Sequence, residues 1–192
     1  GKKYLDDAEI SAYSLNHSRG IYEGQRAVSD KRVVNLTRSS YAGQHRYATI
    51  TWSGDIASSW DVLARQIPEG LNFCASGEPY WSFDIGGFFV APGGGWFRAG
   101  GYDLGYRELY VRWLELGAFL PMMRSHGTDT PREIWRFGEA GEPFYDAIAK
   151  YIRLRSELMP YIYSTAADIC FDGGAFMTPL GLAFPNDTVC YD

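Results

Sequence analysis

The chain has 192 residues, of which 46% are hydrophobic and 16% aromatic, and it carries a formal net charge of −5. This length and composition suffice to build the core of one globular domain. The 18 basic residues form no cluster, which argues against nucleic acid as a partner. No apolar run approaches the ~20 residues that a membrane-spanning helix needs, so the sequence predicts no membrane segment.

The cysteines predict no disulfide framework. Cys74, Cys170 and Cys190 are odd in number and lack CxxC spacing. Such residues among apolar neighbours are typically free thiols. They leave the compartment open: a periplasmic or extracellular location and a cytoplasmic one both remain.

Helical and strand-like patterns alternate along the chain. Residues 7–29 are expected to form a helix, because Ile10, Tyr13, His17 and Ile21 recur at three- and four-residue steps. The other expected elements are strands at 32–37 and 48–52, a helix capped by Ser58 or Ser59 with Trp60, Leu63, Ile67 and Leu71 on one face, a strand at 79–84, a helix through Leu109, Trp113, Leu116 and Gly117, a strand at 119–124, and a helix at 143–167 kinked by Pro160.

This alternation predicts the α/β class, with parallel strands joined by crossover helices. One connection departs from the pattern. Only ten residues separate Arg38 from Thr49, which is too few for a full crossover helix. The Gly-rich segment 91–101 is expected to be a loop.

Four motifs follow one another along the chain. They are Thr-Arg-Ser-Ser-Tyr-Ala-Gly at 37–43, Trp-Ser-Gly-Asp at 52–55, Asp-Ile-Gly-Gly-Phe at 84–88 and Arg-Ser-His-Gly at 124–127. In order and spacing they resemble glycoside hydrolase family 31, the α-glucosidases and α-xylosidases. The resemblance extends over essentially the whole chain and implies an eight-stranded TIM-type (β/α) barrel.

Four predicted strands correspond to about half of such a barrel. The resemblance therefore implies a partial TIM-type barrel in residues 1–170, roughly its second half, followed by an exit segment, 171–192, toward a C-terminal β-domain. The family's nucleophile, an aspartate in a Trp-x-Asp-x-x-Glu type motif, is expected a few dozen residues before Gly1. These residues alone are accordingly expected to be inactive, with open barrel edges covered by a second copy or another polypeptide.

Asp55 is the predicted general acid/base. A retaining glycosidase needs two carboxyl groups about 5–5.5 Å apart, one of which protonates the leaving oxygen and later deprotonates water. Gly54 allows a tight backbone turn, and Trp52 can shield one side of the carboxyl group. The alternative for Asp55 is a helix N-cap before residues 56–59.

The resemblance also implies that Arg38, Trp52, Asp84, Phe88 and His126 bind the sugar. Each falls at the carboxyl end of an expected strand or in the loop after it, where α/β barrels place their functional groups. The alternatives are a structural ion pair for Arg38, a turn before two glycines for Asp84, core packing for Phe88 and a structural role for His126.

Neither a metal nor another cofactor is expected. His126 lies three residues before Asp129, but two candidate ligands without a third are weak evidence for a metal site.

The leading hypothesis is part of a retaining, exo-acting hydrolase of terminal α-glucosyl or α-xylosyl residues, with an oligosaccharide or glycoside as its substrate. One alternative is a transglycosylase or α-glucan lyase of the same family, which would share the covalent intermediate. Another is a non-catalytic carbohydrate-binding domain, for which aromatic and polar groups suffice.

Overall fold

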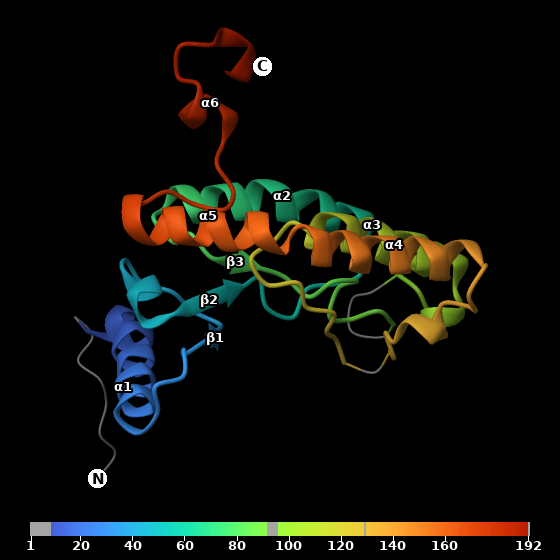
Figure 1. The fold of residues 1–192 in the computed structure, drawn as a ribbon. Helices are drawn as coiled ribbons and strands as arrows, with labels where there is room; N and C mark the ends of the chain where they lie inside the picture. Colours follow the sequence, from blue (N-terminus) through green and yellow to red (C-terminus); the bar gives the residue numbers. More distant parts are fainter. Residues whose placement is uncertain (1–8, 92–95, 129, 192) are drawn as a thin grey trace.

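The computed structural model describes residues 9–91, 96–128 and 130–191. The helices and strands, labelled in Figure 1, are α1 (Tyr13–Val28), β1 (Asn35–Thr37), β2 (Thr49–Trp52), α2 (Trp60–Ala75), β3 (Trp81–Ser82), α3 (Leu104–Gly117), α4 (Pro143–Glu157), α5 (Met159–Asp172) and α6 (Leu180–Ala183). None of the helices in this part of the chain is long and apolar enough to cross a bilayer.

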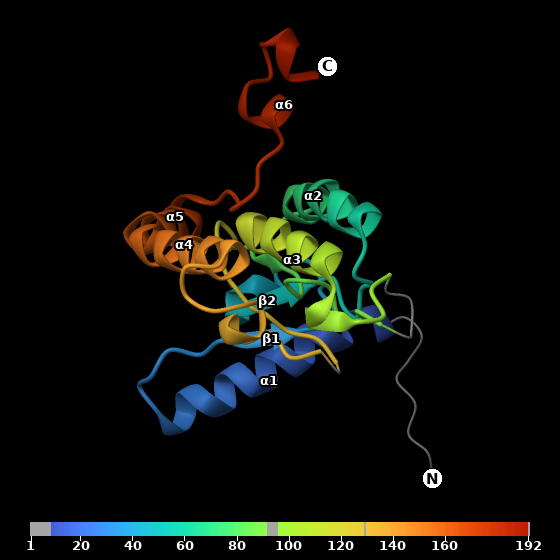
Figure 2. The ribbon, with the colours of Figure 1, turned by 90° about the vertical axis from the view of Figure 1, so that its right-hand side faces the viewer.

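The three strands form one parallel sheet in the order β1-β2-β3. Figure 2 shows α2, α3, α4 and α5 as a layer over one side of the strands, with α1 on the opposite side. Helix α2 makes the crossover from β2 to β3. Parallel strands joined by a covering helix confirm the predicted α/β class and are consistent with part of a (β/α) barrel.

The β1–β2 connection contains only a short 3-10 helix, Gln44–Tyr47, as the ten-residue spacing predicted. Gln44 is fully buried, and its Nε2 donates to Ser18 Oγ of α1 at 3.2 Å and to Ser39 O at 3.0 Å. In the absence of a crossover helix, the Gln44 side chain therefore attaches the β1–β2 connection to α1.

Helix α1 confirms the predicted helix, but the residues whose spacing predicted it do not form its buried face. Its buried residues are Ser14 and Ser18, whereas Tyr13 and Ile21 are exposed. Asp7, where the helix was expected to begin, lies outside the described residues. The small serine side chains let α1 approach the buried Gln44, so the apolar stripe faces away from this contact.

The core lies between the end of the sheet and α3. Helix α3 buries residues at three- and four-residue steps, among them Tyr106, Leu109 and Trp113. Phe83 packs edge-on against Trp113, with ring centroids 6.0 Å apart. Asp103 begins the helix, because its Oδ1 accepts from two first-turn amides.

The predicted fourth strand, 119–124, is wrong. The structure has a turn there, and the parallel pairing found nearby among the described residues is an isolated bridge between Ile85 and Ser125. Arg155 of α4 explains the turn: its guanidinium donates to the carbonyl oxygens of Ala118, Leu120 and Pro121. These carbonyl groups are thus taken up by a side chain and do not enter a strand ladder.

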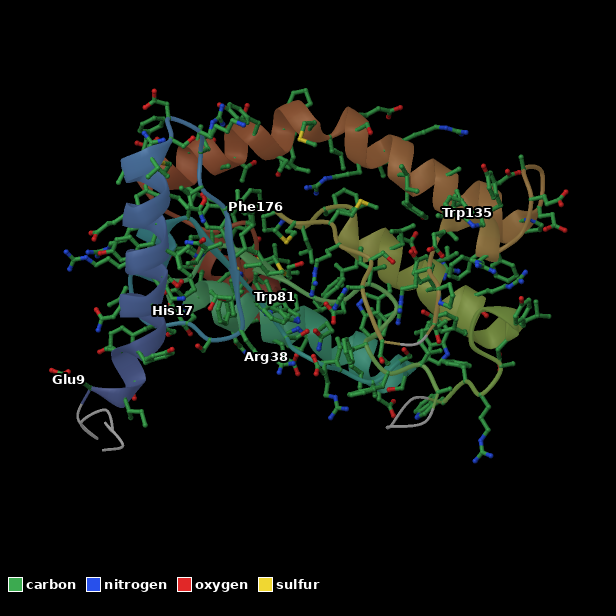
Figure 3. The ribbon with its side chains drawn as sticks, turned by 90° about the horizontal axis from the view of Figure 1, so that it is seen from below. Glu9, His17, Arg38, Trp81, Trp135 and Phe176 are labelled. Carbon is green, nitrogen blue, oxygen red and sulfur yellow. The ribbon has the colours of Figure 1, made fainter. Side chains whose placement is uncertain are left out.

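The helix predicted at 143–167 is two helices, α4 and α5, which meet at Leu158. Pro160 lies in the first turn of α5, where its missing N–H costs nothing, which confirms the predicted break. After α5 the chain returns to β3: Phe176 N donates to Pro79 O at 3.4 Å, and its ring lies 5.5 Å from that of Tyr80. Figure 3 shows Phe176 and Trp81 near the centre of the view.

A buried carboxyl group, Glu78, gives the fold a pH dependence. Glu78 is 7% exposed. Burial raises its pKa, and the neighbouring Ser40 hydroxyl, the charge of His45 and the backbone of Gln44 and Gly43 oppose that rise. The folded-state pKa is above the unfolded one, so this group's contribution to stability is present at low pH and lost as the pH rises through the folded pKa.

Replacing Glu78 by glutamine should therefore stabilise the folded protein more at neutral than at acid pH. The unfolding temperature of Glu78→Gln minus that of the unsubstituted protein is expected to increase from about pH 4 to about pH 7. Thermal unfolding followed by circular dichroism measures it. A difference that stays constant over this range would contradict the assigned pKa shift.

Candidate active site

The candidate residues gather where the strands end. Arg38 directly follows β1, Asp55 lies three residues after β2, and Asp84 lies two residues after β3. His126 follows the residue that bridges to the segment after β3. Because the strands are parallel, these positions meet at the carboxyl edge of the sheet, the edge at which α/β barrels carry out their chemistry.

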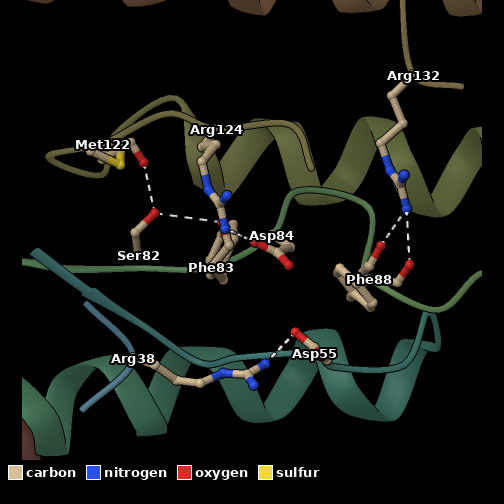
Figure 4. Close-up of polar contacts among 10 residues, drawn as sticks. Arg38, Asp55, Ser82, Phe83, Asp84, Phe88, Met122, Arg124 and Arg132 are labelled. Atoms are coloured by element: carbon tan, nitrogen blue, oxygen red, sulfur yellow. Dashed lines mark hydrogen bonds and ion pairs between the residues drawn. The ribbon is translucent and has the colours of Figure 1, made fainter. Parts of the chain in front are cut away.

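Asp55 is not a helix cap. Helix α2 is capped by Ser59, whose Oγ accepts from Val62 N at 3.3 Å. The turn before Asp55 needs Gly54, which adopts a left-handed φ of +81°. The Asp55 Oδ1 atom accepts a hydrogen bond from Arg38, and both side chains are partly exposed, at 38% and 57%. Such an exposed pair adds little to stability, so its main effect is to orient the carboxyl group (Figure 4).

Asp84 is fully buried and paired with Arg124, which donates to its Oδ1. Its Oδ2 is buried and has no hydrogen-bond partner among the described residues. Burial raises the pKa of Asp84; the positive charges of Arg124, His126 and Arg132 oppose this rise, and the negative charge of Asp55 adds to it. One carboxylate oxygen thus has free capacity to accept a hydrogen bond, in a site whose ionised groups act on one another.

Trp52 connects the two ion pairs. The guanidinium carbons of Arg38 and Arg124 lie 5.6 and 5.3 Å from the centroid of its ring, within the range of cation–π attraction. Trp52 therefore helps to set the positions of the arginines that hold Asp55 and Asp84. Arg124 belongs to the Arg-Ser-His-Gly motif but is not among the residues predicted to form the site. An arginine at the end of an apolar run is the signal that could have found it.

Hydrogen bonds to backbone carbonyl groups tie the three loops together. Phe88 N donates to Ile56 O at 2.7 Å, and Ser58 Oγ donates to Gly86 O at 2.5 Å. Thr128 N donates to Phe88 O at 3.1 Å. The loop after β3 is thus bonded on one side to the loop that carries Asp55 and on the other to the loop that carries His126.

Phe88 and His126 form an aromatic pair at this junction, with ring centroids 5.7 Å apart and planes inclined by 45°. Phe88 is half-buried and His126 exposed, and His126 borders a cavity of about 370 Å³. Asp129, the second residue of the suggested metal pair, lies outside the described residues. Within the described part of the chain, no three His, Cys, Asp or Glu side chains form a cluster that could hold a metal ion.

The sequence is similar to proteins of one known enzyme family. The sequence pattern of the glycosyl hydrolases family 31 TIM-barrel domain matches residues 4–165. An alpha-xylosidase of Saccharolobus solfataricus is 46% identical over 183 residues, which are 95% of this chain and 24% of the relative. Alpha-xylosidase A of Aspergillus niger is 38% identical over 90% of this chain and 25% of its own length.

Solved structures agree. The fold superposes on the family 31 alpha-xylosidase of Xanthomonas citri with a TM-score of 0.85 and 43% identity, over the whole chain and 22% of that structure. A dextranase of Flavobacterium johnsoniae from the same family gives a TM-score of 0.81 and 32% identity, over 95% of this chain and 22% of that one. The chain spans about a quarter of the length of the curated relatives it matches. It belongs to glycoside hydrolase family 31 and carries part of the family's TIM-barrel domain.

Proposed function

We propose that this chain is part of a retaining, exo-acting α-glycoside hydrolase that removes terminal α-xylosyl or α-glucosyl residues. The observation that carries the proposal is Asp55: a partly exposed carboxyl group at a strand end, oriented by Arg38 and not used as a helix cap. In a double displacement, a carboxyl group so placed serves as acid in the first step and as base in the second.

In this proposal, Asp55 protonates the glycosidic oxygen while a nucleophilic aspartate outside these 192 residues attacks the anomeric carbon. Asp55 then deprotonates the water that hydrolyses the glycosyl-enzyme intermediate. For Asp55 Oδ1 to reach the glycosidic oxygen, Arg38 has to turn from the carboxyl group to a sugar hydroxyl, which its partial exposure permits.

Asp84 and the aromatic groups are proposed to hold the sugar. The unpartnered Oδ2 of Asp84 suits a hydroxyl donor, and a bond from a hydroxyl to a buried carboxylate is worth about 1.5–3 kcal/mol. The faces of Trp52 and Phe88 and the imidazole of His126 supply contacts to the ring. The identity to proteins named alpha-xylosidase, 46% and 38%, favours xylosides over glucosides.

We further propose that residues 1–170 are the second half of the barrel and that 171–192 lead out of it. Figure 1 supports the second part, because the segment with α6 extends away from the other helices. Self-association through open edges of the barrel stays a prediction; among the described strands, β1 and β3 each pair only with β2.

Product analysis on the complete enzyme tests the function. Incubation with an α-xyloside and the matching α-glucoside should release free sugar of retained anomeric configuration, and release should be faster from the xyloside. A new glycoside would indicate a transglycosylase, and an unsaturated anhydro-sugar a lyase. Binding without any product would leave only a carbohydrate-binding role. Residues 1–192 alone should show no hydrolysis, because they lack the nucleophile of the covalent step.

A further inference from the structure

Arg132 lies outside the four motifs, yet its side chain joins two of the loops that build the site. Its guanidinium donates to Gly87 O at 2.5 Å and to Phe88 O at 3.5 Å, both in the loop after β3 (Figure 4). It also donates to Thr130 O at 2.8 Å, in the loop after His126. One planar group thus bonds the carbonyl oxygens of two loops, and a lysine cannot do this in the same geometry.

The surroundings are shaped to receive this group. A Cβ atom on Gly127 would collide with the guanidinium of Arg132, so the glycine of the Arg-Ser-His-Gly motif leaves the space that the guanidinium occupies. Where the loop after β3 faces α3, a Cβ atom on Gly86 would lie 2.8 Å from Tyr106 Oη. Burial raises the pKa of Tyr106 and the charge of Arg132 opposes that rise, which agrees with a guanidinium beside the phenol.

The bonds of Arg132 act on Phe88 and His126 in particular. Phe88 O accepts from both Arg132 and Thr128 N, so the carbonyl of Phe88 is bonded from two positions in the opposite loop. Thr128 is two residues from His126, and the Phe88 and His126 rings are neighbours at 5.7 Å. The distance between these two rings therefore depends on the link between their loops.

We propose that Arg132 is a positioning residue that fixes the spacing of Phe88 and His126, and thereby the fit of the sugar ring in the site. The role in sugar binding rests on the function proposed above; the link between the loops does not. Loss of the link between the loops should displace both rings while the core, most of whose residues belong to α3 or to the segment 81–97, stays intact.

The test uses Arg132→Met and Arg132→Lys in the complete protein, with Arg136→Met as the matched control. The Arg136 side chain is 52% exposed, and the ion pair that it forms among the described residues is a long one, with Glu133 at 3.9 Å. Hydrogen exchange followed by mass spectrometry is the readout that does not depend on activity. In Arg132→Met, peptides covering 86–89 and 125–130 should exchange at least about tenfold faster, with 60–75 unchanged.

The second readout is kinetic. Arg132→Met should lower kcat/KM by roughly 10- to 100-fold, because a displacement of about 1 Å in a site can have that effect. Arg132→Lys should recover part of the lost kcat/KM, and Arg136→Met should have the same kcat/KM as the unsubstituted protein. Normal exchange in the two loops of Arg132→Met would overturn the proposal, as would faster exchange with unchanged kcat/KM. If the unsubstituted protein hydrolyses no glycoside, the proposed function fails, and the exchange result still decides whether Arg132 links the loops.

Discussion

Replacing Asp55 by asparagine is expected to lower the rate of hydrolysis of an unactivated disaccharide by roughly 10²–10⁴-fold in the complete enzyme. Asparagine keeps the size of the side chain but cannot transfer the proton that a poor leaving group requires. Because the Arg38–Asp55 pair is partly exposed, its loss should change the free energy of unfolding by no more than about 1 kcal/mol. Steady-state kinetics and thermal unfolding of the same preparation measure the two effects separately.

The leaving group supplies an internal control for this prediction. An activated aryl glycoside needs little protonation, so its first step should be much less affected by Asp55→Asn than that of the disaccharide. Asp61→Asn, at an exposed position in the first turn of α2, should leave both substrates unaffected. An unchanged rate on the disaccharide in Asp55→Asn would remove this residue from the mechanism.

Substitution of Asp84 by asparagine is expected to reduce kcat/KM by roughly 10- to 100-fold, since a hydrogen bond to a charged group is worth about 1.5–3 kcal/mol. The amide retains an acceptor for Arg124 but replaces the unpartnered carboxylate oxygen by a donor. Asp84→Ala should be worse for folding, because Arg124 would lose its partner in a buried site.

His126→Ala provides the comparison that separates binding from folding. His126 is exposed, so its truncation should lower kcat/KM with little loss of unfolding temperature. If Asp84→Asn and His126→Ala lowered the unfolding temperature equally while the folded enzymes kept normal kinetics, both residues would be structural. Asp61→Asn again serves as the exposed control.

Much of the fold could be predicted because local patterns decide it. The expected strand patterns at 32–37, 48–52 and 79–84 each contain an observed strand, and a helix spacing lies within each long helix. The ten residues between Arg38 and Thr49 excluded a crossover helix, and the chain uses a 3-10 turn there. The break before Pro160 followed from the missing N–H of proline.

The choice of buried helix face could not be predicted in the same way. In α2 the residues expected on one face, Trp60 and Ile67, are exposed, while Gln66, Gly70 and Cys74 are buried. A Cβ atom on Gly70 would lie 2.8 Å from the ring of Trp81. The close approach of α2 to β3 therefore favours glycine at position 70, and hydrophobicity alone carries no information about how near the neighbouring strand comes.

The family, the parallel α/β architecture and the segments whose carboxyl ends bear Arg38, Asp55 and Asp84 could be read from the amino-acid sequence, because motif order and strand position are local properties. The partners of the charged groups became apparent in the folded chain: Arg38 with Asp55, Arg124 with Asp84, and both arginines against Trp52. These pairs join residues 17 and 40 positions apart, and which guanidinium meets which carboxylate depends on how parallel strands align their ends. Spacing along the chain does not contain that information.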